Sequence, residues 1–214
     1  MIVTDIKGRI RTNLDDAGIT FYSEADVTDS LQETYNEVVA VTQPMECVRE
    51  ISFVSQQVYY NLQELIPDYL RPLAIFNKNI NRFLAFKDLS YVQNERIDWE
   101  LATGEPRVFI LLDYRYIALF PRLETASGSM EVFYKAKANT LRDTSVPVVP
   151  DGNTIILEEG ATGDLLEQKE EFTKAQMYFS NYFEKLDKIR AGVNFRPFPD
   201  RVAQMREAYY GDHR

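Results

Sequence analysis

The first segment of the chain has apolar residues at helical spacing. Between residues 2 and 17 they recur at every fourth position, which places them on one face of a helix. These apolar positions are Ile2, Ile6, Ile10 and Leu14. Lys7, Arg11 and Asp15 lie on the opposite face and are expected in solvent, and Gly18 ends the predicted helix.

A second helix is predicted to begin after Ser23 and to end before Pro44. Ser23 stands three residues before Asp26, which is the spacing of a capping box. The inner stripe of this helix is Val27, Leu31, Thr34, Val38 and Val41. Two helices joined by a short loop predict an antiparallel helical hairpin.

The middle of the chain changes to period two, as expected for strands. Residues 47–54 and 58–62 alternate in this way, and we predict that they pair as a hairpin. Further short strands are predicted at residues 73–76, 82–86, 108–112, 117–121 and 130–134. Pro67 and Pro72 bracket a predicted turn, and residues 125–129 form the turn between the last two strands. About six or seven strands suffice for a small sandwich or barrel.

Helical spacing returns in the last third of the chain. Residues 155–166 predict a helix interrupted near Gly160 and Gly163, and these glycines indicate either a break or a close contact between helices. Residues 172–192 then carry a strong helical stripe that ends at Gly192. The stripe consists of Phe172, Ala175, Phe179, Tyr182, Phe183, Leu186 and Ile189.

Together these patterns predict an α+β protein in which an antiparallel β-domain is inserted into a helical bundle. The bundle comprises residues 1–44 and 150–192, and the β-domain comprises residues 45–149. The chain is expected to leave the sheet through a proline-containing linker at residues 141–151. Residues 193–214 are predicted to form an extended C-terminal docking tail.

Composition limits the chemistry of the chain. The formal net charge of −9 argues against a DNA-reading module. With one cysteine and only His213 as histidine, neither an internal disulfide nor Ser-His-Asp, Cys-His or histidine–metal chemistry is expected. Residues 160–164 lack the Lys-Ser/Thr ending of a phosphate loop. No apolar run approaches the roughly 18 residues of a membrane span, so no membrane partner is expected.

Adjacent carboxylates are the remaining candidates for catalysis. The pairs are Asp15-Asp16, Glu158-Glu159 and Glu170-Glu171. Neighbouring residues on a helix point in different directions and do not share one site, so solvated faces are the preferred interpretation. A hydrolase would need two carboxylates brought together from distant segments, and no residues nominate such a pair. We therefore predict no catalytic residue, no metal site and no cofactor.

The aromatic residues are the best candidates for function. The chain has 13 Tyr and 13 Phe, and consecutive aromatics on a strand point to both of its faces. The strand candidates for contact with a tail component or another subunit are Tyr59, Tyr60, Tyr114, Arg115 and Tyr116. In the C-terminal tail, aromatics alternate with arginines, which is typical of protein-binding segments. The tail candidates are Phe195, Arg196, Phe198, Arg201, Arg206, Tyr209 and Tyr210.

A known family shares this order of elements. A helical hairpin precedes a β-insert with a Trp-x4-Gly-x-Pro-like element at residues 99–106, a strand ending in Pro at 119–121 and a Val-x-Tyr strand at 132–134. A proline-containing exit and a returning helical pair follow. The chain thus resembles, over nearly its whole length, the head-to-tail adaptor proteins of tailed bacteriophages.

The resemblance implies a structural virion protein rather than an enzyme. Members of this adaptor family form a ring, usually dodecameric, that docks on the portal protein. The ring seals or extends the DNA channel and carries the next tail protein. The implied partners are therefore the portal protein, the next tail protein and other copies of this chain. The acidic channel would make transient, non-specific contact with genomic DNA, which it repels. The protein would assemble in the host cytoplasm and reside at the head–tail interface.

The alternative function is a ligand-binding module. Exposed Tyr114, Tyr116 and Trp99 would form an aromatic platform for a carbohydrate. A monomer or small oligomer with ligand affinity is expected in that case, whereas an adaptor is expected to form a large ring or to assemble on a portal.

Overall fold

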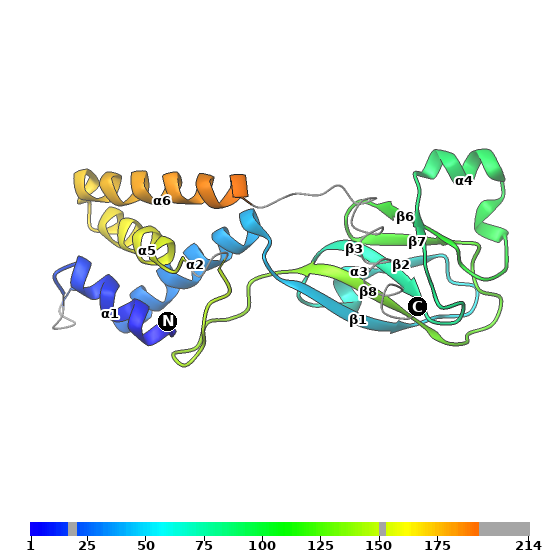
Figure 1. Cartoon of the computed structure of the whole chain (residues 1–214), viewed down its shortest axis with the longest axis horizontal. Coiled ribbons are helices and arrows are strands. Elements are labelled where there is room, and N and C mark those ends of the chain that lie inside the picture. The colour runs from blue at the N-terminus through cyan, green and yellow to red at the C-terminus, as the bar shows by residue number, and fades with distance from the viewer. Residues whose placement is uncertain (17–20, 150–152, 193–214) are drawn as a thin grey trace, which may run out of the picture. The chain divides into compact units, whose positions relative to one another are not determined.

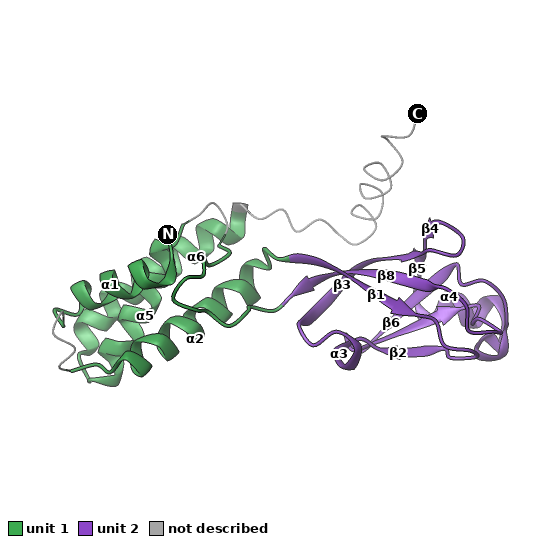
Figure 2. Ribbon diagram, turned by 90° about the horizontal axis from the view of Figure 1, so that it is seen from below, with its two compact units in different colours: residues 1–45, 137–194 green, residues 46–136, 195–214 purple. Residues whose placement is uncertain are grey.

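The computed structural model describes residues 1–16, 21–149 and 153–192, and divides them into two compact units (Figures 1 and 2). Residues 1–45 and the described residues from 137 onward form a helical unit, and residues 46–136 form a β unit. Helices and two separate sheets make the protein an α+β fold, as predicted. Residues 137–149, expected as part of the β-domain and its exit, group with the helices.

The helical unit has four helices from the two ends of the chain. They are α1 (Val3–Asn13), α2 (Glu24–Thr42), α5 (Ile155–Gln168) and α6 (Phe172–Gly192). The predicted capping box at the start of α2 is confirmed. The Asp26 backbone N–H donates to Ser23 Oγ at 3.1 Å, and the Ser23 N–H donates to Asp26 Oδ2 at 2.9 Å. These two bonds satisfy backbone donors that the first helical turn leaves without partners.

Helix α5 lies between the other helices and is continuous. The predicted alternative of a break at Gly160 and Gly163 is wrong, and the alternative of a close helix contact is confirmed. A Cβ atom at Gly160 would lie 2.5 Å from Thr34 Cγ2 of α2 and 3.0 Å from the Tyr182 ring of α6. At Gly163 it would lie 3.0 Å from the Phe179 ring. Both positions therefore need glycine so that the neighbouring helices can approach.

Lys7 and Arg11 are buried, although the helical spacing placed them in solvent. Each is 8% exposed. Lys7 Nζ donates to Asp143 Oδ1 at 2.8 Å and to Glu24 Oε1 at 3.0 Å, while Arg11 Nη2 donates to Glu24 Oε2 at 2.9 Å. These hydrogen bonds, first from Arg11 and then from Lys7, lower the pKa of Glu24. The two cations thus tie α1 to the start of α2 and to the segment at residue 143.

That segment, residues 137–149, packs on the helices. The Val3 N–H donates to the Ser145 carbonyl at 2.9 Å, and Leu141 and Val149 belong to the helical core. The predicted linker is therefore a structural part of the bundle, which it closes over α1.

Two of the carboxylate pairs also differ from the predicted solvated faces. Glu158 is 6% exposed and pairs with Arg9 at 3.5 Å, and burial raises its pKa. Asp16 is 2% exposed and accepts the Tyr22 backbone N–H at 3.0 Å. Glu170 and Glu171 lie on the surface, as predicted. The buried carboxylates are structural because described residues supply their hydrogen bonds and ion pairs.

The β unit contains two four-stranded sheets, and its described strands do not close into a barrel. In the first sheet the order is β1 (Glu46–Ser52), β8 (Ser129–Ala136), β3 (Tyr69–Asn77) and β4 (Arg82–Phe83). In the second it is β2 (Tyr59–Asn61), β7 (Tyr116–Phe120), β6 (Val108–Leu112) and β5 (Ala85–Phe86). Three short helices complete the unit: α3 (Leu62–Leu65), α4 (Leu89–Glu95) and η1 (Trp99–Leu101).

The predicted hairpin of residues 47–54 and 58–62 is wrong. Strand β1 pairs with β8, and β2 pairs with β7 in the other sheet. Pro72 is likewise not in a turn, since it lies inside β3 at an irregularity in the pairing with β8. Strands β6 and β7 do pair as antiparallel neighbours, while β5 joins β6 in parallel.

We predict that Gly160→Ala destabilises the protein. Alanine favours a helix over glycine by about 1 kcal/mol. The added methyl would lie 2.5 Å from Thr34 Cγ2, and such overpacking costs about 1–3 kcal/mol. Urea denaturation should show a net loss of up to about 2 kcal/mol in the free energy of unfolding. Gly8→Ala on α1 is the matched control because nothing lies within 4 Å of its Cβ position, and it should stabilise the protein. Equal gains at both positions would contradict the close contact.

Candidate protein-docking site

Tyrosines gather on one face of the second sheet. Strand β2 pairs with β7 so that Tyr59 lies opposite Ala118 and Asn61 lies opposite Tyr116. Directly opposite residues share a face, and residues two apart on one strand share it too. Tyr59, Asn61 and Tyr116 therefore lie on the same face. Tyr59 is 41% and Tyr116 39% exposed, so large aromatic surface is left in solvent.

Tyr59 is held in place on this face by its neighbours. Its ring packs edge-on against Trp99 with 6.2 Å between the ring centroids, and its hydroxyl donates to Glu100 Oε1. Burial, and then the Glu100 carboxylate, raise the pKa of Tyr59 to about 12. The ring is thus pre-ordered, and a partner that binds it would lose little side-chain entropy.

The β6–β7 turn carries the next two candidates beside Tyr116. Asp113 and Tyr114 have φ angles of 50° and 49°. The Leu62 N–H donates to the Arg115 carbonyl at 2.8 Å, which fixes the turn to the end of β2. Tyr114 is 70% exposed. Arg115 pairs with Asp113 at 3.2 Å, but both are exposed and such a pair adds little stability. We name Tyr59, Tyr114, Arg115 and Tyr116 the tyrosine face.

Tyr60 and Trp99 do not belong to an exposed site. Tyr60 is 1% exposed, and its hydroxyl accepts the Val54 backbone N–H at 3.0 Å, so it is a core residue rather than a surface contact. Trp99 is 6% exposed and packs in a cluster with Val92 and Ile110. An open carbohydrate platform built on Trp99 is therefore wrong.

The tail candidates lie outside the described residues. They are Phe195, Arg196, Phe198, Arg201, Arg206, Tyr209 and Tyr210. Their role as a docking element stays a prediction.

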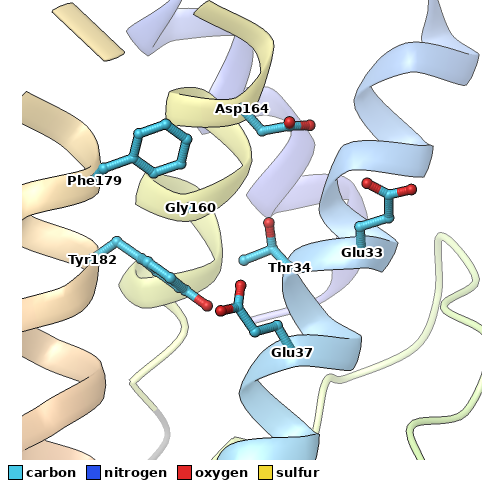
Figure 3. Close-up of a pocket in the computed structure, with 7 residues that line it drawn as sticks. All are labelled: Glu33, Thr34, Glu37, Gly160, Asp164, Phe179 and Tyr182. Atoms are coloured by element: carbon cyan, nitrogen blue, oxygen red, sulfur yellow. The ribbon is translucent and has the colours of Figure 1, made fainter. Parts of the chain in front are cut away.

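The helical unit contains a pocket with a volume of about 150 Å³, which the sequence pattern did not predict. Figure 3 shows it between α2, α5 and α6. Its lining consists of Glu33, Thr34, Glu37, Gly160, Asp164, Phe179 and Tyr182. The one available signal was Glu33 and Glu37 at i and i+4, which places two carboxylates together on a helix. We name these residues the acidic pocket.

The described part of the chain contains no group of three His, Cys, Asp or Glu side chains placed to hold a metal ion. Within the same residues no helix combines the length and the apolar character that crossing a bilayer requires.

The chain matches the model of the SU10 adaptor protein family over residues 1–206. It belongs to this family of phage head-to-tail adaptors, whose members are structural components of the head–tail junction. No curated protein matches the chain.

We predict that Tyr59 titrates with a pKa of about 12. Because this value lies above the ordinary 10.0, the stability it contributes is complete below pH 10 and is lost as the pH rises to about 12. The absorbance of phenolate, compared between the native chain and Tyr59→Phe, measures the titration. Glu100→Gln should move the pKa back toward the ordinary value. A Tyr59 that titrates near 10 in the native chain would refute the contact with Glu100.

Proposed function

We propose that the protein forms a homo-oligomeric ring, of twelve copies as is usual for such adaptors, that docks on the portal protein and carries the next tail protein. The match to the adaptor family over residues 1–206 carries this proposal. Assembly would take place in the host cytoplasm, and the ring would extend and seal the DNA channel. No catalytic role is assigned.

The tyrosine face is suited to contact with the next tail protein. Tyr and Arg are enriched in the residues that dominate protein interfaces. Tyr114 is 70% exposed on a turn held at both ends by strands, so it presents a large apolar ring at small entropic cost.

The tail residues 193–214 are suited to contact with the portal. Phe195 and Phe198 supply apolar anchors, while Arg196, Arg201 and Arg206 supply donors for carboxylates. Peptide segments that carry such anchors commonly bind in grooves of a partner protein.

The acidity of the chain suits passage of DNA. At a net charge of −9 each copy repels phosphates, so genomic DNA would contact the channel only transiently and non-specifically.

Removing residues 193–214 should abolish portal binding. The thermal unfolding midpoint, measured for the shortened and the full chain, checks that the two units still fold. Sedimentation and negative-stain imaging of the protein mixed with its cognate portal measure ring assembly. A chain with residues 193–214 in scrambled order controls for length and charge, and should also fail. Binding that survives the deletion would move the docking surface to the bundle.

Tyr114→Ser combined with Tyr116→Ser should separate the two docking steps. The portal would still bind, whereas binding of the next tail protein would weaken by about tenfold or more, because such anchors commonly contribute over 1 kcal/mol each. Tyr91→Ser is the matched control, since Tyr91 is 40% exposed on α4 of the same unit. Surface plasmon resonance against each partner provides the measurement. A loss of portal binding instead would reverse the proposed orientation.

A further inference from the structure

The acidic pocket holds three carboxylates without a cation. Glu33 and Glu37 come from α2 and Asp164 comes from α5. None of the three forms a salt bridge with any residue in the described ranges. Like charges at i and i+4 on a helix repel each other. Glu33 and Glu37 are exposed and Asp164 is half-buried, so the pocket is a negatively charged site that a cation can reach from solvent.

A buried hydroxyl in the pocket also lacks a partner. Tyr182 is 2% exposed, and its hydroxyl makes no hydrogen bond of normal geometry within the described part of the chain. Figure 3 shows this hydroxyl pointing toward the carboxylate of Glu37. Its lone pairs remain open to a donor, and a buried polar group without a hydrogen bond costs stability. Burial, and then the Glu37 carboxylate, raise the pKa of Tyr182. The hydroxyl is therefore polarised toward Glu37, and its oxygen can still accept an N–H donor of a bound cation.

The geometry favours an extended organic cation over a metal ion. The carboxylates do not converge into a metal-ligating group among the described residues. A guanidinium instead spreads five N–H donors over a plane, so it can serve separated carboxylates and the Tyr182 hydroxyl together. The Phe179 ring in the pocket wall offers a face on which guanidinium stacks. A pocket of about 150 Å³ accommodates a side chain rather than a larger ligand.

The rim indicates that another protein presents this cation. Phe183 packs beside the pocket, with 6.3 Å between its ring centroid and that of Phe179, and is 52% exposed. A bulky exposed aromatic next to a charged pocket is typical of a protein interface, where apolar rings surround a charged anchor and exclude water from it.

We propose that the acidic pocket binds an arginine side chain of a partner protein. The edge of the guanidinium donates to Glu33, Glu37 and Asp164 and to the Tyr182 hydroxyl, while its plane stacks on the Phe179 ring. The affinity of the pocket for guanidinium does not rest on the proposed function, whereas the partner that presents the arginine does.

The Thr34 methyl group reports occupancy because Thr34 lines the pocket. In the full chain labelled at threonine methyls, N-acetyl-arginine amide should shift this NMR resonance with half-saturation near 1 mM, roughly the affinity expected for a ligand of this size. N-acetyl-citrulline amide, which is neutral and nearly isosteric, should not. A shift that is equal for citrulline, or that does not saturate, would overturn the proposal. An equal response to lysine amide or to Mg²⁺ would overturn the guanidinium assignment.

Matched variants locate the site. Glu37→Gln should weaken arginine binding about tenfold, as expected for a hydrogen bond to a charged group. Asp29→Asn, an exposed carboxylate on the same helix, should leave it unchanged. Equal losses in the two variants would reduce the effect to general acidity and refute the pocket.

A separate assay tests the protein partner. Glu33→Gln with Glu37→Gln should reduce incorporation of the chain into assemblies with its portal about tenfold, whereas Asp29→Asn should not. Unchanged incorporation, with arginine-amide binding lost, would overturn the partner assignment and leave the adaptor role standing. A last variant changes Arg196, Arg201 and Arg206 to Gln and is measured with no probe added. A shift of the Thr34 resonance in this variant would assign the pocket to the chain's own arginines, which would also overturn the partner assignment.

Discussion

The helical unit depends on the burial of α5 against its neighbours. Seven of its residues from Ile156 to Gly163 are buried beside other helices, and glycine at 160 and 163 lets α2 and α6 approach. A helix buried on most sides loses its polar stripe and with it the 3.6-residue period. This explains why the sequence predicted an interrupted helix here. The same sequence predicted α6 correctly, because one side of α6 faces solvent and its period is plain.

Contacts between distant residues are what the sequence could not indicate. Lys7 and Arg11 lie opposite the apolar stripe of α1, but Asp143 and Glu24 meet them there and compensate their charge. These partners lie up to 136 residues away. In the β unit, alternation correctly located most strands yet carried no information on partners, so β1 and β2 were paired with each other instead of with β8 and β7.

The candidate sites were predictable to different degrees for a related reason. Exposure of Tyr59, Tyr114 and Tyr116 follows from strand alternation and a turn, which are local properties. The opposite position of Tyr60 follows from the same alternation once the buried face is known. The acidic pocket is lined by residues of three helices, among them Gly160. Only the packing of the helices brings its residues together.

The position of Gly160 links stability and recognition in the helical unit. Because Gly160 has no side chain, Thr34 and Tyr182 can approach its backbone closely. Gly160 also lines the acidic pocket. The pocket is therefore a product of the packing that holds the bundle together, and it is pre-formed rather than assembled by a ligand. The tyrosine face belongs to the other unit, which has its own core around Trp99 and Ile110. Because each unit is stabilised by its own core, substitutions on one surface should leave the other intact, and the two docking activities can be measured separately.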